Sequence, residues 1–114
     1  QKYYLSALSG WQGDTILRNP DNNPNRAGAL AITPAEVGSF EELLWDVVSG
    51  EVQAVIALGN ACDESAERLA PLAALPAVIS FASNEGVLSN AASVVVPVAS
   101  WAESQGSFVN AQGK

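Results

Sequence analysis

The sequence predicts an α/β protein with a short parallel sheet and helices on both faces, a three-layer arrangement. Three apolar runs carry this prediction, at residues 52–58, 77–81 and 94–98, because they are rich in β-branched residues and nearly continuous. Parallel strands covered on both faces have this pattern, whereas strands with one wet face alternate apolar and polar residues. Helical patterns lie before and after the first run, which is the order of a layered α/β fold with right-handed crossovers.

The clearest helix begins after Ser39 and ends before Gly50. Ser39 and Glu42 have the spacing of a capping box, in which each side chain accepts a hydrogen bond from the other residue's backbone. Gly50 suits the left-handed position that ends a helix. A second helix is expected after Asp63, its N-cap residue. One buried face of the first helix follows the i, i+3, i+4, i+7, i+8 pattern: Phe40, Leu43, Leu44, Val47 and Val48.

The first 36 residues carry weaker signals. Apolar residues at loose helical spacing predict a helix over residues 3–8, with Gly10 as its stop. Residues 15–17 fit an edge strand, and residues 19–25 are turn-forming throughout and indicate a loop. A second capping box at residues 33–36 predicts one short helical turn.

Length and composition indicate one folded domain over residues 1–114. Apolar residues make up 48% of the chain and charged residues 15%, which argues against disorder. The chain begins with Gln1 and contains no Met, so we interpret it as a fragment cut from a larger protein. No apolar run approaches the roughly 20 residues that span a bilayer, so membrane insertion is not expected.

Twelve acidic residues against five Lys and Arg give a net charge of −7. This balance argues against nucleic acid and anionic lipid as partners and favours a neutral or basic protein surface. The single Cys62 excludes an internal disulfide and suits a reducing, cytoplasmic compartment. The absence of His, with only one Cys, argues against a zinc site or an iron–sulfur cluster within these residues.

The C-terminal segment has a recognisable motif, A-S-V-V-V-P-V-A-S-W-A-E-S-Q-G-S-F-V-N-A-Q-G-K at residues 92–114. Ser100 and Glu103 form a capping box that starts one helical turn. Gly106 permits a sharp reversal, and Phe108 is expected to plug the turn onto the core. This structural interpretation is complete without a ligand.

The same segment closely resembles A-D-V-V-L-P-A-A-S-F-A-E-K-D-G-T-F-T-N-T-E-G-R of the molybdopterin oxidoreductase superfamily. Two weaker matches keep the same order along the chain. Residues 25–30, N-R-A-G-A-L, resemble the family's N-x-R-G-A-x-D-x-G loop, although Ala27 separates Arg26 from Gly28. Residues 52–60 lie where the family has a strand ending in G-E-N-P. The resemblance implies a Rossmann- or flavodoxin-like sheet.

In cofactor-bearing relatives the loop after this strand lies against the guanine dinucleotide of the molybdopterin cofactor. The resemblance therefore marks Gly59, Asn60 and Arg26 as cofactor-binding candidates, vestigial or weak. Here the expected Glu-Asn-Pro is replaced by Asn60-Ala61-Cys62, followed by acidic residues that repel a pyrophosphate. A plain strand-to-helix turn and a solvated surface Arg are the alternative interpretations. The sequence indicates no catalytic residue and no metal ligand.

The resemblance is strongest to the large peripheral subunit of NADH:quinone oxidoreductase (complex I). It implies a structural or assembly domain with a degraded cofactor pocket, itself without catalysis, in a cytoplasmic oxidoreductase at the membrane face. Its partners would be other domains of the same subunit and neighbouring subunits, and its parent's iron–sulfur clusters would lie elsewhere. One alternative is part of the dinucleotide-binding half of a molybdopterin enzyme such as a formate dehydrogenase. The other is a free-standing small-ligand module, disfavoured because no Gly-rich phosphate loop is present.

Overall fold

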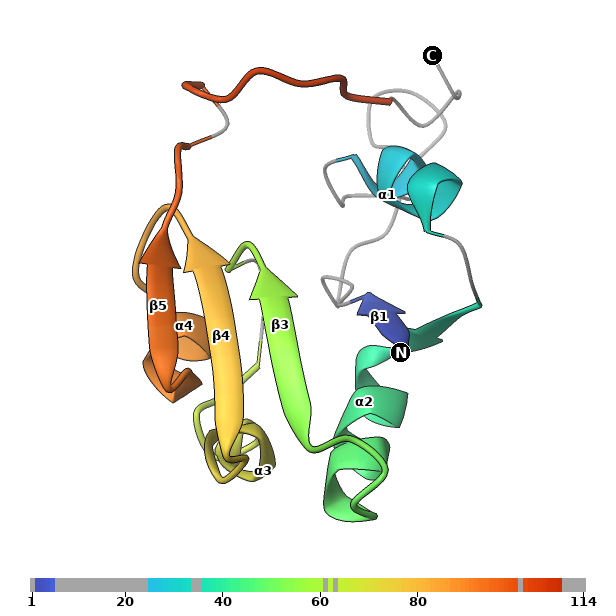
Figure 1. Ribbon diagram of the computed structural model, residues 1–114, viewed down its shortest axis with the longest axis vertical. Coiled ribbons are helices and arrows are strands. Elements are labelled where there is room, and N and C mark those ends of the chain that lie inside the picture. The colour runs from blue at the N-terminus through green and yellow to red at the C-terminus, as the bar shows by residue number, and fades with distance from the viewer. Residues whose placement is uncertain are drawn as a thin grey trace, which may run out of the picture.

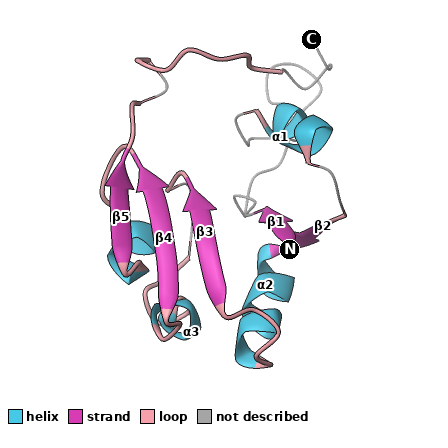
Figure 2. Ribbon diagram, in the orientation of Figure 1, coloured by secondary structure: helices cyan, strands magenta, loops and turns pink. Residues whose placement is uncertain are grey.

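A computed structural model describes residues 2–5, 25–33, 36–60, 62, 64–100 and 102–109. Helices and strands alternate along these residues (Figures 1 and 2). In chain order the elements are β1 (Tyr3–Leu5), α1 (Arg26–Ile32), β2 (Val37–Ser39), α2 (Phe40–Val48), β3 (Ala54–Leu58), α3 (Ala70–Ala73), β4 (Ala77–Ala82), α4 (Val87–Ala91) and β5 (Val94–Pro97).

The three apolar runs form one parallel sheet in the order β3-β4-β5. Ile56 pairs with Ile79 of β4, and Ile79 pairs in turn with Val94 of β5. In a parallel sheet, paired residues point to the same face, so the register defines two faces. The predicted α/β class with a short parallel sheet is confirmed.

The helices of this unit lie on one face of the sheet only. Helix α3 connects β3 to β4 and α4 connects β4 to β5, and Figure 1 shows both behind the sheet. On that covered face Val78 and Ala82 are buried. On the opposite face Ile56 is 67% exposed and Leu58 is 83% exposed. The second helical layer that the sequence predicted is therefore not formed by the described residues.

The strand order explains this one-sided cover. Successive right-handed crossovers place their helices on the same face whenever the chain keeps stepping in one direction across the sheet. Helices reach the second face only where the strand order reverses. The order β3-β4-β5 contains no reversal. Continuous apolar strands thus predicted the sheet correctly but did not reveal which elements cover its second face.

A second, two-stranded sheet joins β1 to β2 in parallel, with Tyr3 opposite Val37. The helix predicted over residues 3–8 is therefore wrong at residues 3–5, and residues 6–8 lie outside the described part. Tyr is a good strand former, and pairing with residues 37–39 overrides the weak helical spacing. This pairing joins segments more than 30 residues apart, so local pattern could not reveal it. Residues 25–30, expected to be a loop, instead enter helix α1.

Helix α2 forms as predicted from its capping box. The Ser39 hydroxyl accepts from the Glu42 amide at 3.2 Å, and the Glu42 carboxylate accepts from the Ser39 amide at 2.6 Å. Leu43 and Val47 are buried and form the core with two residues around α3, Leu69 and Leu72. Val48 was expected on the buried face but is 70% exposed, because it lies at the last turn of the helix.

The shorter helices and turns differ in part from the predicted ones. The helix expected after residue 63 begins later, as turns at residues 66–69 followed by α3, and a short helix, α4, stands where only a turn was expected. Of the turn expected at residues 33–36, the structure describes Thr33, which caps α1 in an extended conformation, and residue 36. The expectations for residues 10, 15–17, 19–24 and 63 lie outside the described residues.

The C-terminal segment makes its predicted helical turn. The amides of Glu103 and Ser104 both donate to the Ser100 carbonyl at 3.0 Å, and the Glu103 carboxylate accepts from the Ser100 amide at 3.0 Å. The placement of Phe108 on the core was wrong, since its side chain is 59% exposed. Figure 1 shows the reason: the segment after β5 crosses over to α1 and does not fold back onto the sheet. Within the described residues, no helix has the length and apolarity to cross a membrane.

The core assignment predicts a large difference between two Leu→Ala changes. Leu72→Ala removes a fully buried side chain and should lower the free energy of unfolding by about 2–5 kcal/mol. Leu58→Ala is the matched control, since that side chain is largely exposed and its loss should cost less than about 1 kcal/mol. Urea denaturation followed by circular dichroism measures both. Equal losses would contradict the assigned core.

Candidate functional site at the carboxyl edge of the parallel sheet

Gly59 and Asn60 lie where the sequence placed them, directly after the carboxyl end of β3. Gly59 has a φ of 82°, which favours glycine, and its amide donates to the Phe81 carbonyl of β4 at 2.8 Å. Open parallel sheets bind ligands outside their carboxyl ends. The turn therefore has the position of a nucleotide site in such folds. Whether it can bind a nucleotide depends on which of its polar groups are free of hydrogen bonds within the fold.

Both polar atoms of the Asn60 amide are engaged within the fold. Its Nδ2 donates to the Asn84 carbonyl at 3.0 Å, and its Oδ1 accepts from the Ser89 amide at 3.2 Å. The side chain thus ties the turn after β3 to the loop after β4 and to helix α4. A Cβ atom at Gly86 would collide with the Asn60 amide group, so any larger residue there would displace the Asn60 side chain from these hydrogen bonds. Asn60 acts as a clamp between neighbouring strand ends.

Two amides at the N-terminus of α4 are also engaged within the fold. The Ser89 hydroxyl accepts from the Gly86 amide at 2.9 Å and donates to the Gly86 carbonyl at 3.0 Å. The Ser89 amide is taken by Asn60. A phosphate held at a helix N-terminus needs such amides unoccupied. The described strands of this sheet also have no order reversal, which is where doubly wound folds form their binding crevice.

Arg26 is not brought to this edge. It begins α1 and is exposed, and it borders a small surface hollow with residues of β1, β2 and α2. None of the residues around that hollow comes from the turn at Gly59: Leu5, Leu30, Val37, Gly38, Ser39 and Glu42. The structure therefore separates the three predicted cofactor-binding residues into a pair, Gly59 and Asn60, and a lone Arg26. As arranged, these residues do not fit a guanine dinucleotide.

Asn25 is a connecting residue that the sequence did not identify. Its Oδ1 accepts from the Val109 amide at 2.8 Å, and its Nδ2 lies 3.4 Å from the Ser107 carbonyl. Its backbone is left-handed, with a φ of 56°, and a Cβ atom at Gly28 would collide with its side chain. The two segments with the family-like motifs, residues 25–30 and 92–114, therefore meet through one Asn side chain. An Asn at the end of a turn-forming run, three residues before a Gly, was the available signal.

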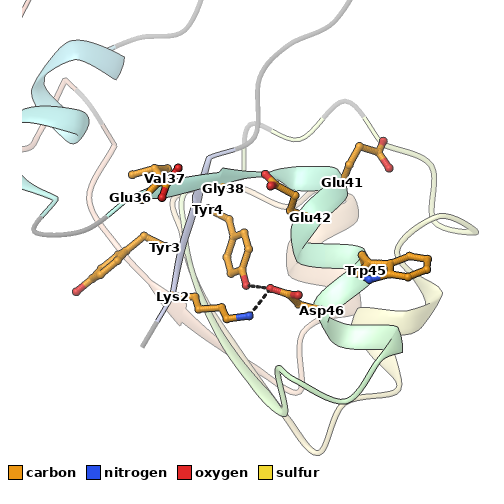
Figure 3. Close-up of a pocket in the computed structure, with 10 residues that line it drawn as sticks. All are labelled: Lys2, Tyr3, Tyr4, Glu36, Val37, Gly38, Glu41, Glu42, Trp45 and Asp46. Atoms are coloured by element: carbon orange, nitrogen blue, oxygen red, sulfur yellow. Dashed lines mark hydrogen bonds and ion pairs between the residues drawn. The ribbon is translucent and has the colours of Figure 1, made fainter.

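Another hollow lies between β1, β2 and α2 (Figure 3). Its volume is about 860 Å³, and its lining is acidic and aromatic. At its centre Asp46 accepts from the Tyr4 hydroxyl and from the Lys2 ammonium, the latter at 2.9 Å. Figure 3 shows the side chains of Glu41 and Trp45 pointing away from this centre. The hollow is open and its acidic side chains do not converge on one point.

The central groups are held far from neutral titration. Burial and the hydrogen bond to Asp46 raise the pKa of Tyr4 to about 12. The hydrogen bonds from Tyr4 and Lys2 lower the pKa of Asp46. The Ser39 backbone and side chain lower the pKa of Glu42 through the capping box. A general acid or base needs a pKa near the working pH, and each of these shifts moves the pKa further from neutrality.

Among the described residues, no group of three or more His, Cys, Asp and Glu side chains is placed to hold a metal ion. Nearby carboxylates are instead paired with a cation. Arg68 forms ion pairs with Glu41 and, at 2.9 Å, with Glu64. The pair with Glu41 links α2 to the segment before α3, and the pair with Glu64 lies within that segment.

Comparisons with protein-family models, with curated proteins and with solved structures found no match to this chain.

The Tyr4–Asp46 contact predicts a measurable titration. In a Tyr3→Phe background Tyr4 is the only tyrosine, and its ionisation, followed at 295 nm, should have a pKa near 12. Because this pKa is raised above the unfolded value of about 10, the associated stability is present below pH 10 and is lost as the pH rises through 12. Asp46→Asn should lower the Tyr4 pKa. A pKa near 10 in the parent background would contradict the contact.

The two hydrogen bonds of the Asn60 side chain predict that removing this side chain lowers the stability of the fold. Asn60→Ala leaves the Ser89 amide without its acceptor and should lower the free energy of unfolding by about 1–3 kcal/mol. Asn84→Ala is the control, because Asn84 receives the Asn60 hydrogen bond through its backbone carbonyl, which the change retains. Thermal and urea denaturation of both variants would test this. If Asn60→Ala is as stable as Asn84→Ala and the unchanged chain, Asn60 does not hold the strand ends together.

Proposed function

We propose that this chain is a structural and assembly domain of a protein like the large peripheral subunit of NADH:quinone oxidoreductase, with a degraded cofactor pocket. The carrying observation is the engagement of both polar atoms of Asn60 with Asn84 and Ser89. A residue that would face a dinucleotide in a cofactor-bearing relative is used here to join strand ends. The domain then contributes shape and surfaces to its parent, and no chemistry of its own.

Electrostatics also supports a cofactorless interpretation. The chain carries a net charge of −7, and the turn at Gly59 is followed in sequence by Asp63 and Glu64. Carboxylates beside a pyrophosphate raise the cost of binding it. Arg26, the cation that the resemblance would assign to a phosphate, belongs to a different part of the surface. No compensating positive charge therefore lies with Gly59 and Asn60 among the described residues.

Within such a parent the domain is placed among the other domains of the same polypeptide and the neighbouring chains of the complex, at the cytoplasmic face of the membrane. The parent would oxidise NADH and pass electrons to quinone through iron–sulfur clusters in other regions. The resemblance of residues 92–114 is the basis for this assignment. The meeting of this segment with residues 25–30 through Asn25 supports it, since both matching motifs belong to one surface.

The second candidate is part of the guanine dinucleotide-binding half of a molybdopterin oxidoreductase. One observation favours it: the motif segments meet beside Arg26, which begins α1 next to Asn25. In that case the polar groups near Asn25 would face the cofactor once the rest of the parent is present. The clamp at Asn60 argues against it, because nucleotide contact there would require two internal hydrogen bonds to break.

Titration of this chain with a nucleotide tests the cofactorless proposal. In a calorimetric titration, GDP, the nucleotide half of the cofactor, should give no saturable heat with this chain at concentrations up to about 1 mM. Any dissociation constant would then exceed about 1 mM, which corresponds to a binding free energy of about −4 kcal/mol. Amide chemical shifts of Gly59, Asn60 and Arg26 should not move in the same titration. A GDP-binding protein measured in parallel controls for the assay. Saturable binding that Arg26→Ala weakens would overturn the cofactorless proposal and favour the molybdopterin enzyme.

A further inference from the structure

One face of the three-stranded sheet carries no helix of the described residues, and it is apolar over all three strands. We call it the open face, and the register assigns to it Ala54, Ile56, Leu58, Ala77, Ile79, Phe81, Val94 and Val96. Exposure is greatest on β3, with Ile56 at 67% and Leu58 at 83%, and Val94 on β5 is 52% exposed. Single exposed apolar residues are ordinary, but a contiguous apolar patch marks an interaction surface.

The open face contains no charged or hydrogen-bonding side chain, so its partner must be apolar where it touches. Helices are the elements that cover the faces of parallel sheets in α/β proteins. Five residues at about 3.3 Å each, across three strands about 4.8 Å apart, give a footprint of roughly 16 by 14 Å. A helix of about 11 residues is about 16 Å long and 10 Å wide, so one helix lying along the strands fits the footprint.

A second copy of the chain is a poor occupant by charge. Each copy carries a net charge of −7, and like charges repel. A helix with basic residues on its polar side removes this repulsion and replaces it with attraction.

We propose that the open face docks one amphipathic helix of a partner protein, with an apolar stripe on the sheet and Lys or Arg on its outer side. The proposal rests on the assembly function proposed above and names the surface and the chemistry of the partner. Helix-in-groove recognition of this kind is specified by apolar residues at i, i+3, i+4 and i+7. The exposed positions Ile56, Leu58 and Val94 would supply the main contacts.

A synthetic peptide tests the proposal on the chain as it is. The probe is an 18-residue, end-capped Ala/Leu/Lys peptide with Leu at i, i+3, i+4 and i+7, titrated against the ¹⁵N- and methyl-labelled chain. Saturable binding at submillimolar peptide is expected, with shifts confined to the open face. A scrambled peptide of the same composition, and one with Glu in place of Lys, should each bind at least about tenfold more weakly, by about 1.4 kcal/mol.

Substitutions locate the binding surface. Leu58→Asn and Ile56→Asn alter exposed side chains, so the fold should persist, and each should weaken peptide binding at least about tenfold. Val48→Asn, at an exposed apolar position on α2, is the matched control and should leave binding unchanged. No saturable binding, equal binding of the scrambled peptide, or shifts on α2 would overturn the proposal. Sedimentation showing dimers that Leu58→Asn dissociates would overturn it in favour of a second copy.

The combined results of the peptide and GDP titrations distinguish failure of the docking proposal from failure of the assembly function on which it rests. Failure of the peptide to bind, with GDP still inert, would remove the helix site and leave the cofactorless domain. GDP binding together with peptide binding would remove the cofactorless domain and leave the docking surface.

Discussion

The right-handed crossover is the constraint on which the three-stranded unit depends. Because β3, β4 and β5 follow one another across the sheet without a reversal, α3 and α4 must lie on the same face. That face holds buried side chains such as Val78. The same constraint leaves the second face without a helix from the described residues, and the order β3-β4-β5 has no reversal at its carboxyl edge. The exposure of the second face and the lack of a reversal among the described strands thus share one topological origin.

Two Asn side chains join segments that strand pairing does not connect. Asn60 joins the turn after β3 to the segment after β4, and Asn25 joins the start of α1 to the C-terminal segment. Each Asn lies against a glycine that leaves room for its amide, Gly86 and Gly28 respectively. In both places the Asn side chain makes hydrogen bonds within the fold.

Local signals predicted the parts of the fold that depend on local interactions. The capping box of Ser39 and Glu42 and the apolar spacing that follows predicted α2, and the three β-branched runs predicted the sheet. Pairing of β1 with β2 and the exposure of Phe108 depend on contacts distant in sequence, so the local pattern failed there. The sequence placed Gly59 and Asn60 at the correct edge, but the clamp depends on Ser89, which is 29 residues away.

One face of the sheet packs against α3 and α4, and no helix of the described residues covers the other. Solvent paramagnetic relaxation of methyl groups with a neutral gadolinium chelate measures this difference directly. We expect strong relaxation of the Ile56 and Leu58 methyls and weak relaxation of those of Val78 and Leu72, in proportion to their exposure. Protection of Ile56 and Leu58 equal to that of Val78 would show instead that both faces are covered within the chain.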